Sequence, residues 1–266
     1  MMKNIFFLFL VGCAIFGCNE KPSKQINDIN VNSEELRNSD FANDSIYFSF
    51  KNNIESDSSL FEASSLDFSK NTGGNIHAEA LIDNNQNIRK LKSVTIDTIQ
   101  ETIQEFYYIN GKKRVSSELI SFFQKESDYF QQYISFYDTS GELLYTGFKT
   151  FEDLINAELI PFEKIDVFMD MSDDYAKNII QQQGDFKTNF RGFVDLDAYN
   201  LEFLKVGSND GRYSSLLAIS DDNPKIQKLK NNEDKFKGNP LRVEFTKVTR
   251  GDGFSYQLLL NVSFNP

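Results

Sequence analysis

The stretch that decides the fold is E-F-Y-Y-I-N-G-K-K-R-V, at residues 105–115. Aromatic and β-branched residues lead into Asn110-Gly111, and a second β-prone run follows. Asn-Gly between two such runs is the strongest short-range signal for a β-hairpin, because both residues accept the positive φ angles of a type I′ turn. We therefore predict a turn between two antiparallel strands here, and not a catalytic loop.

Two more units of the same kind surround this hairpin, each with polar turn residues between β-prone runs. Together the three units predict an antiparallel β-meander over residues 75–151. The flanking units join residues 78–82 to 88–96 across the turn 84–87, and residues 129–137 to 142–150 across the turn 138–141.

The Y-Y-I-N-G-K of residues 107–112 resembles a pattern found in bacterial envelope proteins of uncharacterised function. Residues 82–90 match the same pattern loosely, and the resemblance extends over residues 76–150. It implies a β-sheet and no particular activity.

Residues 152–184 change to helical spacing and predict a helical connector. Within this connector we predict one helix over residues 172–183. Asp173-Asp174 suit its first turn, and Gly184 stands where the residue just after a helix is often a glycine.

Strand patterns return in residues 185–266. Three strands, a short helix at residues 224–231 and two more strands follow in an order similar to that of OB-fold domains. The F-K-G-N-P-L-R-V of residues 236–243 resembles the K-G-K step that introduces the strand after the OB helix, except that Asn239 replaces the second Lys. A plain antiparallel barrel is the alternative. The predicted strands are residues 190–194, 199–206, 213–219, 241–248 and 254–264.

The predicted fold class is therefore mainly β (α+β). It combines an antiparallel β-meander domain at residues 75–151 with a small OB-like β-barrel at residues 185–266, and the helical connector joins them.

The N-terminus carries the clearest functional signal. Lys3 precedes an apolar run at residues 5–17, which has about the length of a signal-peptide core and is too short to span a bilayer. The run ends at Ile15-Phe16-Gly17-Cys18 and resembles the lipobox of bacterial lipoproteins. That resemblance implies that residues 1–17 are removed and that Cys18 is acylated, which anchors the protein in a membrane.

Leu10-Val11-Gly12-Cys13 is a competing lipobox. It fits the pattern better residue by residue, because Phe16 is bulky for its position. However, its apolar run is very short, and cleavage there would leave residues 14–17 apolar in the mature chain. An ordinary cleaved signal peptide or an uncleaved anchor is the remaining alternative.

The lipobox implies a location in the cell envelope. Asn19 is not the Asp that retains lipoproteins at the inner membrane in enterobacteria, so we expect the outer membrane. Acidic residues directly after the Cys mark surface export in some Bacteroidota lipoproteins, and only Glu20 stands in that region. The sequence is consistent with either the periplasmic or the surface face of this membrane.

Residues 18–74 predict a flexible tether, because they are rich in Asn, Ser, Asp, Glu and Lys and offer little apolar surface to bury. Residues 46–50, I-Y-F-S-F, alternate and predict an edge strand within this tether.

Composition excludes several classes of function. The formal net charge of -11, from 39 acidic and 28 basic residues, disfavours a nucleic-acid partner. Cys13 and Cys18 are the only cysteines and His77 is the only histidine, so we predict no disulfide, no His-based triad and no metal site or cofactor. Asp83 begins a stretch like an EF-hand loop, but Ile88 and Val94 take the Gly and Glu positions of that motif.

Acidic pairs and aromatic residues are the remaining candidates for chemistry. The acidic pairs suit a hard cation or a glycosidase, but helix starts and turns explain them equally well. The aromatic residues suit stacking on sugars, or a core role. The candidates are Asp173-Asp174, Asp195/Asp197 and Asp221-Asp222, and Phe190, Phe193, Tyr199 and Phe203.

Three functions are consistent with these observations. The first is a non-catalytic binding or scaffold module that holds a protein or glycan near the membrane. The second is a carboxylate-based hydrolase of envelope glycans, which requires two acids facing one cleft. The third is a structural role in envelope assembly.

Overall fold

The structure is a computed structural model that describes residues 44–123, 129–166, 169–196, 201–220 and 223–264. The leader 1–17, Cys13, Cys18, the first part of the predicted tether, Asp197, Tyr199 and Asp221-Asp222 lie outside the described residues.

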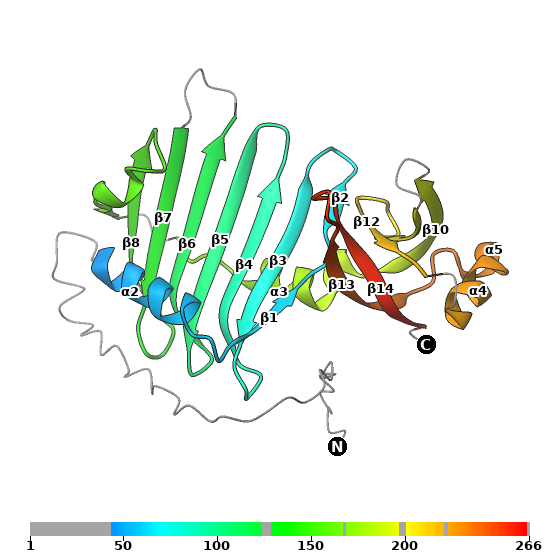
Figure 1. Cartoon of the computed structure of the whole chain (residues 1–266). Coiled ribbons are helices and arrows are strands. Elements are labelled where there is room, and N and C mark those ends of the chain that lie inside the picture. The colour runs from blue at the N-terminus through cyan, green and yellow to red at the C-terminus, as the bar shows by residue number, and fades with distance from the viewer. Residues whose placement is uncertain (1–43, 124–128, 167–168, 197–200, 221–222, 265–266) are drawn as a thin grey trace.

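A long, mainly antiparallel sheet forms the frame of the molecule (Figure 1). Its strand order is β10-β11-β12-β2-β3-β4-β5-β6-β7-β8-β9, so the meander from β3 to β8 pairs each strand with the next one in sequence. Strand β1 (Phe61–Ser64) pairs with β3 outside this order. The strands of the order are β10 (Asn189–Leu196), β11 (Leu201–Gly207), β12 (Tyr213–Ala218), β2 (Phe68–Lys70), β3 (Asn75–Ile82), β4 (Ile88–Ile96), β5 (Gln100–Ile109), β6 (Lys112–Phe122), β7 (Tyr129–Tyr137), β8 (Leu143–Phe151) and β9 (Glu163–Ile165).

The central hairpin is confirmed. Asn110 and Gly111 both have positive φ angles, of 50° and 72°, and join β5 to β6 as a type I′ turn requires. The mainly β fold class predicted from these repeated units is likewise confirmed by the structure.

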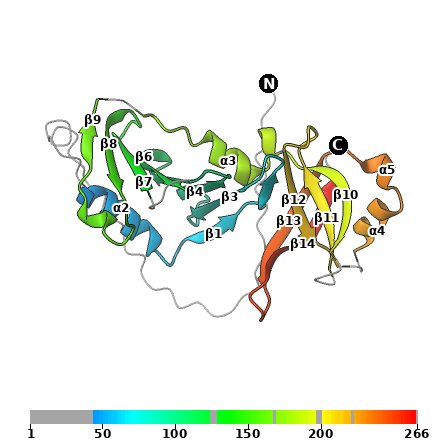
Figure 2. The same cartoon turned by 90° about the horizontal axis from the view of Figure 1, so that it is seen from above.

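Two helices lie on opposite faces of the meander (Figures 1 and 2). Helix α2 (Asp44–Glu55) packs on one face, and α3 (Asp174–Gln181) packs on the other. Each covers its own apolar cluster, and we call the two sides the α2 face and the α3 face. The two short 3-10 turns are η1 (Ala157–Leu159) and η2 (Gly184–Phe186).

The prediction of an edge strand at residues 46–50 is wrong, because these residues form part of α2. Tyr47, Phe50 and Ile54 recur at the helical intervals of three and four and are all buried. Four of the five residues in 46–50 are apolar, so alternation there does not exclude a helix.

The predicted tether is also wrong from Asp44 onward. Besides α2, this region supplies β1 and β2, which pair with β3. Leu66 and Phe68 are fully buried in the cluster that they share with the C-terminal strands. The apolar residues of this segment are few, yet Tyr47, Phe50, Ile54, Leu66 and Phe68 are buried against distant parts of the chain.

The predicted connector is only partly helical. Helix α3 confirms the helix predicted near residues 172–183, but β9 adds a strand to the sheet edge beside β8. The helix also ends earlier than predicted, since Gln182, with a φ of 53°, takes the left-handed position that was expected at Gly184.

The C-terminal unit follows the predicted order of elements. Strand β12 pairs in parallel with β14, β14 pairs with β13, and an isolated bridge joins Asn189 to Pro240. Its elements are β10 (Asn189–Leu196), β11 (Leu201–Gly207), β12 (Tyr213–Ala218), α4 (Pro224–Lys230), α5 (Glu233–Phe236), β13 (Leu241–Thr249) and β14 (Ser255–Phe264).

Strand β2 joins this unit to the meander. It pairs with β3 on one side and with β12 on the other. Gln257 of β14 strengthens the junction, because its side chain accepts from the Asp67 N–H at 3.0 Å and donates to the Ser65 carbonyl at 3.0 Å. The β13–β14 hairpin projects on the same side of the sheet as α2 (Figure 2).

Candidate functional site

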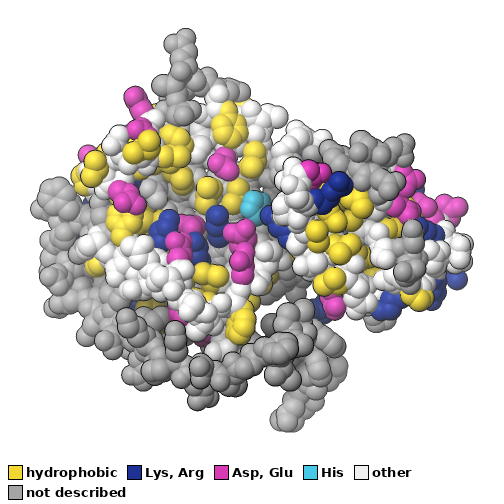
Figure 3. Space-filling model, viewed as in Figure 1, with side chains coloured by type: hydrophobic (Ala, Val, Ile, Leu, Met, Phe, Trp, Pro, Cys, Tyr) yellow, Lys and Arg dark blue, Asp and Glu magenta, His cyan; other side chains and the backbone are white. Residues whose placement is uncertain are grey.

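Charged side chains align across β3, β4 and β5 on the α2 face. Strand register places Glu79 beside Lys92 and Lys92 beside Glu105, so opposite charges alternate in one row. Figure 3 shows blue and magenta side chains at mid-height of the large sheet, with the single histidine at the end nearest the C-terminal unit. We call Glu79, Lys92, Glu105 and the neighbouring Lys90 the charged row.

The inner end of this row is a buried ion cluster. Lys90 Nζ lies 2.7 Å from Glu105 Oε1 and also forms an ion pair with Glu55 of α2. The Tyr107 hydroxyl donates to Glu105 Oε2 at 3.1 Å, and Lys51 approaches the same carboxylate at 3.9 Å. The last residue of α2, Glu55, thus attaches the helix to Lys90 of the sheet.

The surroundings keep this cluster charged. Burial alone would raise the pKa of Glu105, but the charges of Lys90 and Lys51 and the hydrogen bonds outweigh it, so the pKa is lowered. Burial would lower the pKa of Lys90, and Glu105 and Glu55 reverse that effect. A glycosidase acid needs a raised carboxyl pKa, so Glu105 is unsuited to that role.

A pocket of about 210 Å³ opens where the charged row meets the β13–β14 hairpin. It lies between β1, β3 and β13, with Gln257 of β14 in its wall. The side chains that give it chemical character are Glu62, Asp67, His77, Glu79, Lys247 and Gln257.

The charge of this pocket is predominantly acidic. Glu62, Asp67 and Lys247 are exposed and make no ion pair within the part of the chain that the structure describes. Three carboxylates against one ammonium favour a ligand group that is basic or rich in hydroxyls. Its volume is below the roughly 300–1,000 Å³ typical of sites that enclose a whole small molecule. It therefore suits one side chain or one sugar unit of a larger partner.

The rows of the sheet next to the pocket continue this surface. His77 is in register with Val94, Ile103 and Leu119 on the three following strands. Ile103 and Leu119 are only half-buried, and none of the helices in the described residues covers this part of the α2 face. The pocket, the charged row and this apolar row together form what we call the open face.

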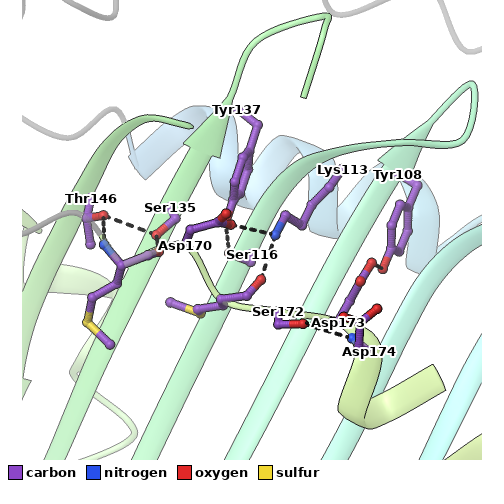
Figure 4. Close-up of polar contacts among 12 residues, drawn as sticks. Tyr108, Lys113, Ser116, Ser135, Tyr137, Thr146, Asp170, Ser172, Asp173 and Asp174 are labelled. Carbon is purple, nitrogen blue, oxygen red and sulfur yellow. Dashed lines mark hydrogen bonds and ion pairs between the residues drawn. The ribbon is translucent and has the colours of Figure 1, made fainter. Parts of the chain in front are cut away.

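The α3 face carries a different polar network (Figure 4). Residues 169–173 cross the strands there without forming a strand or helix of their own, and α3 begins at Asp174. Lys113 holds Asp170 at 2.9 Å and also donates to the Met171 carbonyl at 2.5 Å. Tyr108 donates to Asp173, and Ser135 donates to the Met169 carbonyl at 2.8 Å. These contacts fasten the crossing segment, so we interpret this network as structural.

Asp173, Asp174 and Asp195, the described members of the acidic pairs singled out in the sequence, do not line the pocket. Asp173 is bound by Tyr108 and lies 2.9 Å from Lys177, and Ser172 donates to Asp174 at the helix start. Asp195 is exposed on β10. Asp83 Oδ1 accepts the N–H groups of residues 85 and 87, which closes a turn.

Among the other candidates, His77 lines the pocket, although the sequence indicated only a solvent-facing strand position. The core role is confirmed for Phe190 and Phe203, which are buried, and Phe193 packs against the same cluster. Sequence reasoning missed Lys90 and Glu105. Polar and charged residues surround both of them on β4 and β5, so no signal in the sequence sets them apart.

Comparison of the chain with protein-family models, curated proteins and solved structures finds no match. Within the described residues, no three His, Cys, Asp or Glu side chains are grouped so that they could hold a metal ion. None of the helices in that part of the chain is both long and apolar enough to cross a membrane.

Proposed function

We propose that this chain is a lipid-anchored cell-envelope protein, acylated at Cys18, that binds a protein or glycan partner without catalysis. The partner is placed on the open face of the sheet, with one basic or hydroxyl-rich group in the pocket beside His77. The observation that supports this function best is the acidic pocket at the end of a partly apolar sheet face that no helix of the described residues covers.

The pairing of the carboxylates supports binding over hydrolysis. Glu105, the most buried carboxylate of the charged row, is held ionised by Lys90, and Glu79 is shared with Lys92 at 3.7 Å. A glycan hydrolase remains the second candidate, because Glu62, Asp67 and Glu79 line one pocket. Hydrolysis of envelope glycan that is abolished by Glu79→Gln would favour that candidate over a binding module.

The strand order of the C-terminal unit supports assigning it as an OB-like barrel, which is part of this proposal. A three-stranded meander, a helix and a final hairpin, with the third and fifth strands parallel, is the order of that fold. Backbone bonds from Phe190 to the Asn239 carbonyl and from Leu241 to the Thr188 carbonyl, of 2.9 and 3.0 Å, connect the first and fourth strands.

Photo-crosslinking in intact cells tests the proposed binding face. A photoreactive residue at Lys247 or Ile103, in the lipidated protein, should give a reproducible adduct, whereas one at exposed Thr139 on the far turn should not. Adducts from all three positions would contradict the proposed face. A protein that gives no adduct from any position and also binds no glycan would contradict the proposed function. The anchor has its own test: Cys18→Ala should release the protein from membranes, and Cys13→Ala should not.

A further inference from the structure

The loop between β8 and β9 exposes aliphatic side chains at one end of the molecule. Ile155 is 88% exposed and Leu159 is 79% exposed, which makes them the two most exposed large apolar side chains among the described residues. Leu154 is exposed beside them. Single exposed apolar residues are common on proteins, but three within six positions of one loop require an explanation.

The loop has a defined shape. Lys149 is almost fully buried, and its ammonium donates to the carbonyls of Ala157 at 2.6 Å and Ile160 at 3.2 Å. Asp153 accepts the N–H of Ile155 at 2.8 Å. A buried lysine and a local carboxylate therefore hold the loop in the conformation that presents these side chains to the outside.

The loop also lies beside the point where the N-terminal chain enters the fold. The rings of Tyr47, in the first turn of α2, and Phe162, the last residue of the loop, meet edge to face with centroids 6.4 Å apart. Figures 1 and 2 both show the start of α2 next to η1 at the sheet end remote from the C-terminal unit. Any membrane anchor near Cys18 is thus connected to the body at this end.

We propose that residues 152–160 contact the lipid bilayer directly, with Leu154, Ile155 and Leu159 in the interfacial region of the membrane. This inference rests on the proposed lipid anchor at Cys18. Three aliphatic side chains are too few to hold a protein on a membrane alone, but an anchor converts their binding into an intramolecular step. The contact would orient the body, with the β8–β9 edge toward the membrane.

The charges around the loop define the lipid surface that it fits. Glu152, Asp153 and Glu158 are exposed beside the aliphatic residues. An anionic lipid surface would repel these carboxylates, so the loop fits a zwitterionic surface. Insertion should therefore be deeper in phosphatidylcholine vesicles than in vesicles rich in phosphatidylglycerol.

A spin label at Ile155→Cys, in the full lipidated protein reconstituted into phosphatidylcholine vesicles, tests this contact. The acylated Cys18 cannot react with the label, so the introduced thiol is the only target in the mature chain. Collisions with oxygen and with a water-soluble nickel complex are measured by electron paramagnetic resonance. We expect the label to lose access to nickel and to gain access to oxygen, and labels at Phe123→Cys and Asp252→Cys to stay open to nickel.

Three outcomes would overturn the inference, and they differ in what they say about the anchor. Full nickel access at position 155 in protein that sediments with vesicles would refute the contact and leave the anchor intact. Loss of access to both reagents would mean that a protein surface, such as a second copy, covers the loop. Failure of the protein to sediment, with Cys18 intact, would refute the anchor and the contact together.

Discussion

The two faces of the large sheet use the same chemistry with different degrees of burial. On the α2 face, Lys90 pairs with Glu105, and their side chains are 11% and 12% exposed. On the α3 face, Lys113 pairs with Asp170, but the side chains are 16% and 70% exposed. Each pair joins a lysine to a carboxylate at less than 3 Å, so solvent exposure of the acid is the main difference.

This difference determines what each pair contributes. Removing one partner of a buried pair leaves a charge without water or counter-charge, which is strongly destabilising. Removing one partner of an exposed pair returns the other to water at little cost. We therefore expect the α2 face to control global stability, and the α3 face to control only the placement of residues 169–174.

The largest expected effect is on the buried pair. Glu105→Ala should lower the free energy of unfolding by about 3 kcal/mol, because the buried Lys90 then keeps only the more exposed Glu55 as a counter-charge. Urea denaturation of the purified protein measures this change. The double variant Lys90→Met/Glu105→Leu should recover most of the loss, since an apolar pair of similar volume also removes the buried lysine charge, and Glu55 is exposed enough to be solvated. A loss below about 1 kcal/mol for Glu105→Ala would contradict the burial argument.

The next effect concerns the helix that covers each face. Ile54→Ala on α2 and Ile179→Ala on α3 each remove a buried side chain, and each should cost about 2–5 kcal/mol. Ile179 belongs to the cluster that joins the meander to the C-terminal unit, so its loss should destabilise the whole protein. Ile54 lies near the end of α2, and hydrogen exchange should show α2 opening by itself. Equal global destabilisation by both variants would show that α2 does not open separately.

The effect of pH should be smaller and should act on both faces. The pKa values of Glu105 and Asp173 are both lowered. Burial alone would raise each pKa, but Lys90 beside Glu105 and Lys177 beside Asp173, together with hydrogen bonds, outweigh burial. The two carboxylates stabilise the folded protein fully at a pH above their ordinary pKa values of 4.5 and 3.8. This stabilisation is lost as the pH falls through their lowered pKa values in the folded state.

The lysines give the opposite dependence at high pH. The pKa of Lys90 is raised, so its contribution is complete below 10.5 and is lost as the pH rises above that value. Unfolding measured from pH 2 to 12 should therefore show two falling limbs. Glu105→Gln should reduce the acidic limb, and an unchanged acidic limb in that variant would assign it to other carboxyl groups.

The fourth effect is on the exposed pair of the α3 face. Lys113→Met keeps an unbranched apolar side chain and removes the ammonium that lies 4.3 Å from the centre of the Tyr137 ring and holds Asp170 and the Met171 carbonyl. We expect a loss of about 1 kcal/mol, measured by urea denaturation, with faster proteolysis near residues 169–174. A loss as large as that of Glu105→Ala would remove the contrast between the faces.

The sequence predicted the meander well because its signals are local. Asn110-Gly111 fixes a turn by itself, and alternation fixes the strands on either side, so β4 and β7 have the predicted bounds. The helix α2 could not be predicted in the same way. Alternation in residues 46–50 competes with helical spacing that becomes evident only when Ile54 is included, and the sheet surface that receives α2 decides between them.

The pocket could not be predicted, because it is assembled from three distant segments. Asp67 meets Gln257, which is 190 residues further along the chain, through the pairing of β2 with β12 and of β12 with β14. Strand patterns give no information on such long-range pairs. His77 was visible in the sequence, but its neighbours in space were not.

The smallest expected effect on stability tests function. Lys92 and Glu79 form a pair at 3.7 Å, with side chains 31% and 39% exposed, so Lys92→Ala should change the free energy of unfolding by at most about 1 kcal/mol. The same change frees Glu79 beside the pocket and makes the open face more acidic. If a basic group of a partner binds there, crosslinking from Lys247 should become stronger in Lys92→Ala and weaker in Glu79→Gln.

Opposite responses of two near-neutral variants can arise only from charge on the surface, because a change in folding would move both in the same direction. Identical crosslinking in both variants would therefore exclude the charged row from binding, and would leave the buried ion cluster as a purely structural feature of the α2 face.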